Sequence, residues 1–295
     1  MSTSNNNAGL VAAQGLSEEQ LQQIVNLAKE CEAYDGFDLS ANLNVSMLQN
    51  RPPEQANDFL YFQDGQLVGF LGMYAIVSPK EVEISGMVHP DYRRKGIFRA
   101  LYAKAKAECE ARQVTQILLV SNRESEAASL FAKAVAATYQ FSEYKLDYSA
   151  TGPVHTPEAD QRLQLRPATV NDFDTLVEIG VSGFGETIER TAAVVTRNLS
   201  ESSFQSYLAL YDSEPVGMIT ASDEDDMYYI SGFCVKKELQ GKGLGRKILT
   251  RTVEIIKQKE QKGISLEVAV DNQNALSLYQ SAGFEVVSSY DYYVG

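Results

Sequence analysis

The chain repeats itself once, and this feature limits the folds open to it more than any other. When YYISGFCVKKELQGKGLGRKIL is placed over VEISGMVHPDYRRKGIFRAL, Val235 falls on Val88 and Gly243 on Gly96, an offset of 147 residues. One period of about half the chain favours two duplicated domains over a solenoid, whose repeats are much shorter. The same offset places Lys242 over Lys95 and Arg246 over Arg99, whereas the dipeptides Ser231-Gly232 and Ser85-Gly86 lie one step out of register.

Apolar periodicity and turn residues predict the same mixed α/β order of elements in both halves. A capping box at Ser17 and Gln20 begins the first helix, and tight hairpin turns are expected at Asp64-Gly65 and Ser213-Glu214. The first half is predicted to form helix 17–34, strands 58–63, 66–77 and 82–88, helix 96–112, strand 115–121, helix 124–137 and strand 141–148. The second half is predicted to form strand 163–168, helices 171–184 and 187–199, strands 203–212, 215–223 and 228–235, helix 243–259, strand 264–270, helix 274–282 and strand 284–294.

Four segments follow from this order. Residues 1–15 read as a disordered, solvated tail, because they have no sustained apolar pattern. Residues 149–162 combine small residues, two prolines and charges without periodicity, so they are expected to be a linker. The two predicted domains are therefore residues 16–148 and 163–295.

Composition and charge exclude several classes of function. The formal net charge of -13, without a long run of Lys or Arg, gives no basic surface for a nucleic acid, and favours cationic ligands such as amines. Three widely spaced cysteines and two histidines make a disulfide framework or a metal site improbable. No apolar stretch is long enough to span a membrane, and the first residues do not resemble a signal peptide, so a cytoplasmic protein is expected.

The segment QGKGLG, residues 240–245, lies between a predicted strand and a predicted helix. Glycines at such a turn let backbone N–H groups face outward, and the helix N-terminus adds partial positive charge, so a pyrophosphate can bind there. Lys242 and Arg246 add full charges. The spacing does not fit a Rossmann dinucleotide site, and a Walker A loop would need Ser or Thr after Gly-Lys.

The strand GFCV, the QGKGLG turn and the downstream segment VDNQNALSLYQSAGF together resemble the GCN5-related N-acetyltransferase (GNAT) superfamily. The resemblance implies two tandem acyl-CoA N-acyltransferase domains, each a mixed, largely antiparallel sheet flanked by helices. It also implies that acetyl-CoA, without a metal, lies along the splayed edge of the fourth strand of the second domain. The cofactor-binding residues that it implies are Phe233, Cys234, Val235, Gln240, Gly241, Lys242, Gly243, Leu244, Gly245, Arg246 and Asn272. Cys234 contributes through its backbone, since a thiol in an apolar strand is expected to be buried.

The resemblance gives roles to two further residues, each with a structural alternative. Tyr279 falls where the family has a phenol near the thioester sulfur, although it could instead pack on the last strand. Glu267 matches a carboxylate used as general base in ribosomal-protein acetyltransferase-like members, although it could be a solvent-facing strand residue. Asn272 matches the asparagine that orients the pantetheine, and it is equally suited to be a helix N-cap.

The first copy of the motif, RRKGIF, departs from the family pattern. Phe98 stands where Gly or Ala is expected, and its bulk is expected to crowd the pyrophosphate. Asn122 lies near the position of Asn272, and Phe131 aligns with Tyr279, so the phenol is absent. This half is expected either to bind acyl-CoA without efficient turnover or to shape the acceptor site. Its candidate cofactor residues are Val88, Arg93, Arg94, Lys95, Gly96, Ile97, Phe98 and Arg99.

The sequence therefore predicts an N-acetyltransferase that transfers an acetyl group from acetyl-CoA to a primary amine, by direct attack in a ternary complex, mainly in the C-terminal domain. The alternative is a non-catalytic acyl-CoA-binding or regulatory module. The sequence carries no code for the acceptor, the acyl chain length or the oligomeric state.

Overall fold

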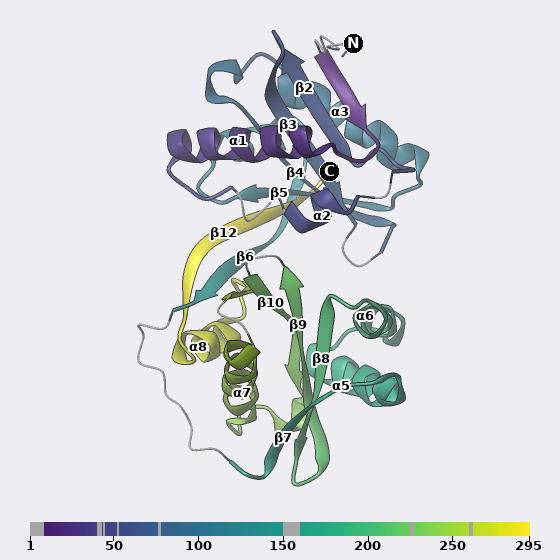
Figure 1. Ribbon diagram of the computed structural model, residues 1–295, viewed down its shortest axis with the longest axis vertical. Coiled ribbons are helices and arrows are strands. Elements are labelled where there is room, and N and C mark those ends of the chain that lie inside the picture. Colours follow the sequence, from purple (N-terminus) through teal and green to yellow (C-terminus); the bar gives the residue numbers. More distant parts are fainter. Residues whose placement is uncertain are drawn as a thin grey trace. The chain divides into compact units, whose positions relative to one another are not determined.

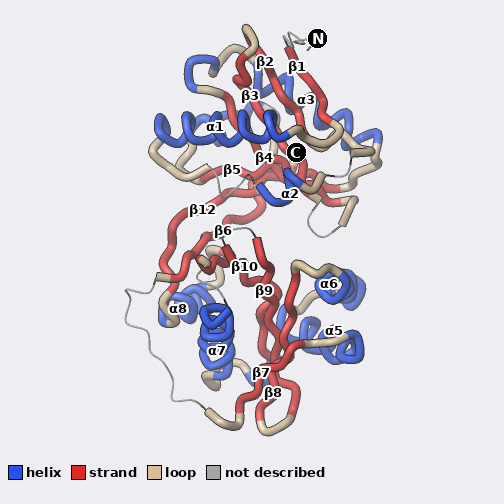
Figure 2. Tube along the Cα trace, viewed as in Figure 1, coloured by secondary structure: helices blue, strands red, loops and turns tan. Residues whose placement is uncertain are grey.

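The computed structural model describes residues 9–39, 43, 45–51, 53–75, 78–149, 160–224, 227–259 and 262–295, which form two compact units. Unit 1 contains residues 1–142 and 288–295, and unit 2 contains residues 143–287. Each unit is a mixed sheet covered by helices (Figures 1 and 2). This confirms the predicted fold class. Most of the expected linker, residues 150–159, lies outside the described residues.

Unit 1 has the strand order β1-β2-β3-β4-β5-β12, and its neighbouring strands are antiparallel except for the parallel pair β4 and β5. Helix α1 covers one face of the sheet and α3 the other (Figure 1). Its elements are β1 (Gly9–Ala13), α1 (Glu18–Asp35), α2 (Val45–Gln49), β2 (Asp58–Gln63), β3 (Gln66–Tyr74), β4 (Glu81–Val88), the 3-10 helix η2 (Pro90–Tyr92), α3 (Ile97–Ala111), β5 (Gln116–Asn122) and α4 (Glu126–Ala134).

Strand β1 corrects the expectation that residues 1–15 are a disordered tail. Residues 9–13 pair antiparallel with β2, from Gly9 opposite Phe62 to Ala13 opposite Asp58. Leu10 and Val11 pack against the two cores on opposite faces of the sheet. The strand is stabilised by this burial on both faces. It was not predicted because five residues are too few to show a hydrophobic period in the sequence.

Unit 2 repeats the arrangement with the strand order β6-β11-β10-β9-β8-β7, and only β10 and β11 are parallel. Helices α7 and α8 lie on one side of the sheet and α5 and α6 on the other (Figure 1). Its elements are β7 (Leu163–Pro167), the 3-10 helix η3 (Val170–Asp172), α5 (Phe173–Phe184), α6 (Ile188–Ser200), β8 (Phe204–Tyr211), β9 (Glu214–Glu224), β10 (Met227–Val235), the 3-10 helix η4 (Lys237–Leu239), α7 (Leu244–Lys259), β11 (Gly263–Ala269) and α8 (Gln273–Ser281).

The last strand of each repeat continues into the other unit. Strand β6 (Thr138–Tyr148) pairs antiparallel with β11 of unit 2 through residues 143–147, and places Lys145 opposite Glu267. Strand β12 (Phe284–Val294) pairs with β5 of unit 1 through residues 290–294. At these two strands the units differ from the contiguous segments 16–148 and 163–295. The period of a strand shows which of its faces is buried, but not which sheet it joins.

Local sequence signals explain several element ends. Ser17 and Gln20 form the predicted capping box of α1. The first hairpin turns at Asp64 and Gly65, whose φ angles are 52° and 81°. The second turns at Asp212 and Ser213, with φ of 52° and 68°, one residue before the predicted position.

The two units differ at one point that matters for chemistry. Strand β4 pairs with β3 in unbroken register from Glu83 to Val88. Strand β10 has a bulge, because its register with β9 shifts by one residue between Ser231 and Cys234. The bulge adds one residue, and this accounts for the one-step displacement of the Ser-Gly dipeptides in the repeat.

Candidate active site

The parallel strands β10 and β11 part before they end. Their pairing runs from Met227 opposite Gly263 to Ile230 opposite Leu266, although β10 continues to Val235 and β11 to Ala269. Backbone groups on this side of β10 beyond Ile230 therefore face an opening between the two strands. A polar ligand that forms main-chain hydrogen bonds fits this opening, because it would pair with groups that would otherwise form the ladder.

The bulge lies in the same stretch of β10. Gly232 has a φ of 54°, and the register passes over Gly232 and Phe233. Phe233 and Val235 turn their side chains into the core under α7, while Cys234 packs toward α5. The predicted residues of this strand thus lie together and present their backbone to the opening.

The loop 240–245 joins β10 to α7 and holds two residues with positive φ, Gly241 at 74° and Gly243 at 78°. A Cβ at either glycine would meet nothing within 4 Å, so the conformation and not crowding selects glycine here. The Gln240 amide donates hydrogen bonds to the carbonyls of Val235 (3.0 Å) and Gly183 (3.4 Å) and fixes the start of the loop. The remaining predicted loop residues lie together at the beginning of α7: Lys242, Leu244, Gly245 and Arg246.

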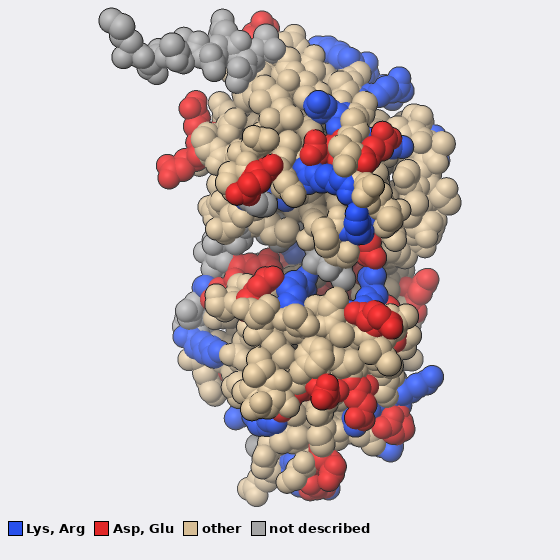
Figure 3. All heavy atoms as spheres, turned by 90° about the vertical axis from the view of Figure 1, so that its right-hand side faces the viewer, with Lys and Arg blue, Asp and Glu red and all other residues tan. Residues whose placement is uncertain are grey.

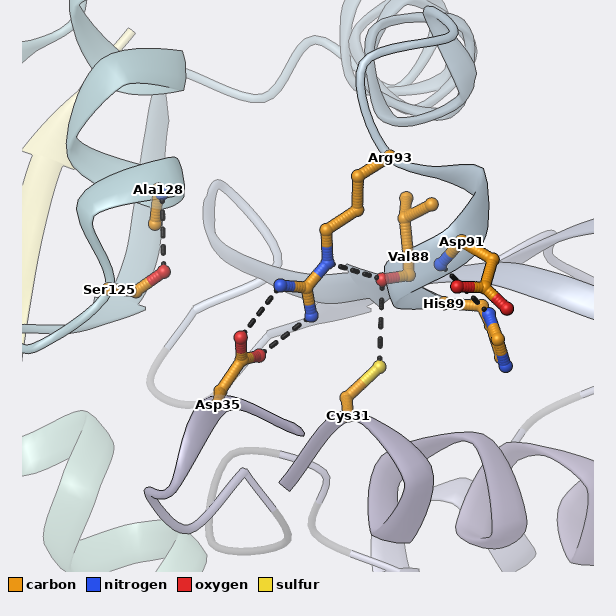
Figure 4. Close-up of polar contacts among 8 residues, drawn as sticks. All are labelled: Cys31, Asp35, Val88, His89, Asp91, Arg93, Ser125 and Ala128. Atoms are coloured by element: carbon orange, nitrogen blue, oxygen red, sulfur yellow. Dashed lines mark hydrogen bonds and ion pairs between the residues drawn. The ribbon is translucent and has the colours of Figure 1, made fainter. Parts of the chain in front are cut away.

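Unit 1 has a loop of nearly the same shape (Figure 4). Arg93 has φ and ψ of -64° and 158°, against -64° and 157° for Gln240, and Arg94 and Gly96 have φ of 63° and 83°. The Arg93 guanidinium donates to the Val88 carbonyl at 2.9 Å, and forms two 2.7 Å bonds to the Asp35 carboxylate. Arg93 therefore holds the loop as Gln240 does. Lys95, Ile97, Phe98 and Arg99 follow at the beginning of α3.

The ring of Phe98 packs against β4 and against Phe131 of α4. A Cβ built on Gly86 would lie 3.1 Å from its ring, and the ring centroid is 4.7 Å from that of Phe131. In unit 2 the corresponding contact joins Gly245 and the Phe233 ring, at 3.7 Å from a Cβ built on Gly245. An aromatic ring fills this space in both units, from α3 in one and from β10 in the other. The expected crowding of a pyrophosphate by Phe98 stays a prediction.

Tyr279 lies on α8 and is almost buried, with 8% of its surface exposed. Its ring packs at 6.3 Å from Phe233 and 6.2 Å from Phe284. Burial, followed by the nearby Cys234 thiol, raises the pKa of Tyr279 to about 12. The phenol therefore keeps its proton at neutral pH and can serve as a hydrogen-bond donor.

Asn272 is the N-cap of α8, and its side-chain oxygen accepts from the Ala275 N–H at 3.1 Å. Ser125 caps α4 in the same way, through the Ala128 N–H (Figure 4). These caps align the two helices at the repeat offset, so Ser125 and not Asn122 corresponds to Asn272. The assignment of Phe131 to the position of Tyr279 is also wrong by one residue.

The residue of unit 1 that corresponds to Tyr279 is Ala132, which is also buried, and Phe131 corresponds to Leu278. Unit 1 therefore has no phenol at this position, as predicted, although for a different residue. The aromatic ring of Phe131 favours the other alignment in the sequence, whereas the two helix caps fix the register.

Glu267 lies on the part of β11 beyond its pairing with β10, and it is half-buried. The Tyr229 hydroxyl donates to its carboxylate at 2.8 Å. Burial raises the pKa of Glu267 to about 7, with a further increase from Glu143 that the Tyr229 hydrogen bond and Lys145 partly offset. This carboxylate is thus ionised and protonated to similar extents near neutral pH, which suits a general base.

A cavity of about 190 Å³ lies between helices α5 and α6 and the sheet of unit 2. Gly232 of the bulge lines it, next to an apolar wall and a polar floor. In the floor, the Ser206 and Thr220 hydroxyls are 2.9 Å apart, and Asn198 donates to Thr220 at 3.4 Å. At about 30 Å³ per water this volume holds roughly six molecules. The cavity therefore accepts a small group and brings it to the bulge.

The corresponding face of unit 1 is filled by side chains. Ser206 and Thr220 are cross-strand partners in unit 2, and their counterparts are the partners Asp58 and Gly72. Asp58 is fully buried and pairs with Arg51 at 3.1 Å. The guanidinium lies 4.6 Å from the centre of the Tyr74 ring, and a Cβ at Gly72 would lie 2.7 Å from the Tyr74 hydroxyl. These side chains occupy the space that is open in unit 2.

Cys234 is unsuited to carry an acyl group. Only 7% of its surface is exposed, and its thiol donates to the Ile179 carbonyl at 3.7 Å. Burial raises its pKa to about 12, so it is not a thiolate at neutral pH.

Sequence reasoning missed Tyr229 and the polar floor of the cavity. Serine and threonine in a strand carry no local sign of a site. The displaced Ser-Gly dipeptide was the one available signal for the bulge.

Figure 3 shows a face on which acidic and basic side chains are interspersed without a continuous basic area among the described residues.

Within the described ranges, no group of three or more His, Cys, Asp or Glu residues could hold a metal ion. No helix in the part of the chain that the structure describes is long and apolar enough to cross a membrane. Of the acidic run 223–226, Asp223 pairs with Lys262 at 2.6 Å, and Asp225 and Asp226 lie outside the described residues.

Comparison with known families finds the acetyltransferase (GNAT) family model twice in the chain, over residues 21–135 and 174–284. A mycothiol acetyltransferase of Propionibacterium freudenreichii subsp. shermanii is 26% identical over 290 residues, which cover 93% of this chain and 88% of that protein. A putative [ribosomal protein bS18]-alanine N-acetyltransferase of Bacillus subtilis is 30% identical over 122 residues, 41% of this chain and 80% of that protein.

Two solved structures share the whole fold. A GCN5-related N-acetyltransferase from Sphaerobacter thermophilus matches with a TM-score of 0.77 at 17% identity, over 97% of this chain and 95% of the other. A tandem GNAT protein from the clavulanic acid biosynthesis pathway matches with a TM-score of 0.71 at 20% identity, over 97% of both chains. The predicted tandem arrangement is confirmed by these matches.

Proposed function

Because the chain belongs to the GNAT acetyltransferase family, which uses an acyl-CoA donor, we propose that unit 2 transfers an acetyl group from acetyl-CoA to a small primary amine. The observation that carries the proposal is the bulge at Gly232. Gly232 lines the cavity, and it also lies in the stretch of β10 that parts from β11. A donor on one side and an acceptor on the other would thus meet at the bulge.

The donor is assigned to the opening between the strands and to the loop. The backbone of Phe233, Cys234 and Val235 offers hydrogen bonds to the pantetheine, and a backbone N–H of the bulged strand is suited to the oxyanion. The loop N–H groups between Gly241 and Arg246, with the N-terminus of α7, suit the pyrophosphate. Asn272 uses its oxygen for the cap, so its amide nitrogen is the group assigned to the pantetheine.

The acceptor is assigned to the cavity, and Glu267 to the removal of its proton, directly or through water. Glu267 first takes one proton from the ammonium and passes it to water. The neutral amine nitrogen then forms a bond to the acetyl carbon as the carbon–sulfur bond breaks, its second proton passes to Glu267, and Tyr279 donates a hydrogen bond to the departing thiolate. An ammonium near pKa 10.4 would lose its proton to an ordinary glutamate at a cost of about 8 kcal/mol. The pKa of about 7 for Glu267 lowers this to about 5 kcal/mol.

Unit 1 is assigned a binding role without turnover. Its loop retains the shape of the unit 2 loop, which supports donor binding. It lacks the bulge and the phenol, and Arg51, Asp58 and Tyr74 fill the face that would admit an acceptor.

The experiment compares Gly243→Val with the matched variant Gly96→Val, since both glycines have positive φ at the same loop position. Acetyl-CoA binding is measured by calorimetry and acetyl transfer by CoA release over a panel of amines. We expect Gly243→Val to remove one binding site and all turnover, and Gly96→Val to preserve turnover. Turnover that survives Gly243→Val but not Gly96→Val would reverse the assignment. Binding without turnover of any amine would favour the acyl-CoA-binding module.

A further inference from the structure

Strand β6 brings charged residues from the first repeat to the sheet of unit 2. Its residues 143–147 pair with β11, and Lys145 lies directly opposite Glu267. Glu143 lies opposite Ala269, two residues further along. Directly opposed residues share a face in an antiparallel pair, and so do residues two apart on one strand. Glu143 and Lys145 therefore lie on the same face of the sheet as the Glu267 carboxylate.

We propose that Glu143 and Lys145 are positioning residues that set the protonation of Glu267, the acidic one favouring the neutral carboxyl and the basic one favouring the carboxylate. The inference rests on the proposed function of unit 2, in which Glu267 takes the amine proton. The first repeat thereby takes part in the reaction of unit 2, although the acceptor face of unit 1 is itself filled.

The charged and polar groups around Glu267 come from three strands. Strand β6 supplies Glu143, Lys145 and, on the same face, Asp147. Strand β10 supplies the Tyr229 hydroxyl at 2.8 Å, and β9 supplies Glu224 near its end. Glu143 and Glu224 raise the pKa of Glu267, as burial does. The hydrogen bond from Tyr229 and the charge of Lys145 lower it. Lys145 is the full positive charge among these groups, and its effect on the pKa of Glu267 is smaller than that of Glu143 and opposite in sign.

Charges on β6 act at short range. Directly opposite Cβ atoms in an antiparallel pair, as at Lys145 and Glu267, are about 5 Å apart, and diagonal neighbours, as Glu143 is, are about 7–8 Å apart. Both spacings lie within the Debye length of about 8 Å at physiological salt. Two variants should consequently shift the titration of Glu267 in opposite directions: Glu143→Gln to lower pH and Lys145→Met to higher pH. A structural effect of either substitution has no reason to produce this pair of signs.

Glu214→Gln is the matched control. It removes one negative charge, as Glu143→Gln does, from the exposed start of the same sheet's β9. Tyr229 lies opposite Ser222, eight residues along β9 from Glu214, which is roughly 26 Å at about 3.3 Å per residue. This distance exceeds the Debye length, so the control should leave Glu267 unchanged.

The experiment titrates the intact protein, labelled with ¹³C at the glutamate side chains, by NMR, and assigns Glu267 by the signal lost in Glu267→Gln. The pH dependence of acetyl transfer is measured in parallel. We expect the Glu267 titration and the acid limb of the rate profile to move down in Glu143→Gln, up in Lys145→Met and not at all in Glu214→Gln.

Equal titrations of Glu267 in all three variants, or shifts of the same sign in Glu143→Gln and Lys145→Met, would overturn the inference. Opposite shifts by NMR with an unchanged rate profile would support the inference and would instead remove Glu267 from the proposed reaction. The two failures are therefore distinguishable.

Discussion

Replacing Tyr279 by Phe tests how the departing thiolate is stabilised. Burial raises the pKa of Tyr279 to about 12, whereas a thiol titrates near 8.5. Complete proton transfer would therefore be uphill by about 5 kcal/mol, and donation of a hydrogen bond is the reasonable role. A hydrogen bond to a charged group contributes about 1.5–3 kcal/mol, which corresponds to a roughly 10- to 150-fold lower kcat in Tyr279→Phe.

The assay measures kcat, acetyl-CoA affinity and melting temperature together. The ring contacts with Phe233 and Phe284 remain in the variant, so donor affinity and melting temperature should change little. Tyr228→Phe is the control, because Tyr228 is equally buried at 8% exposure in the same core. A kcat unchanged in Tyr279→Phe would refute the hydrogen bond. A loss beyond about 10⁴-fold would instead indicate obligatory proton transfer.

Four further outcomes are expected. Gly232→Ala places a side chain at a φ of 54°, which costs roughly 1–2 kcal/mol, so it should lower both the melting temperature and kcat. Wild-type values of both would contradict the role assigned to the bulge. Asp58 has a pKa raised to about 6 by burial, so its contribution to stability is complete below about pH 4 and is lost as pH rises through 6, about 3 kcal/mol in all. Asp58→Asn should abolish that part of the pH dependence in urea unfolding, and an identical slope would contradict it. Cys234 should resist thiol reagents at pH 8 until the protein unfolds, since its pKa is about 12. Gln240→Ala loses both carbonyl contacts and should raise the KM for acetyl-CoA while kcat changes less.

The repeat, the element order and the loop could be predicted because each leaves a local pattern. Glycine at positive φ, as at Gly243, is a property of one residue and its neighbours. Helix caps are equally local, and the capping box predicted at Ser17 is confirmed by the structure. The same holds for Asn272, whose alternative role as an N-cap is confirmed.

The remainder depends on contacts between distant residues. The carboxylate of Glu267 acquires its pKa from burial and from Tyr229 and Glu143, none of which is near it in the sequence. The filled face of unit 1 depends on Arg51 reaching Asp58, and on Tyr74 turning back over Gly72. No hydrophobic periodicity in the sequence indicates these contacts. The contact of the Phe98 ring with Gly86 could not be predicted for the same reason, because Gly86 lies on another element.

The exchange of terminal strands explains why a copy with a filled acceptor face would be retained. Strand β6 begins in unit 1 and ends beside β11, so residues 143–147 satisfy the backbone of the strand that carries Glu267. Without them, β11 would present an unpaired edge next to the proposed base, at the cost of its ladder hydrogen bonds. Strand β12 does the same for β5 in unit 1. Each repeat thus completes the sheet of the other, and the proposed turnover in unit 2 would depend on the strand that the first repeat provides.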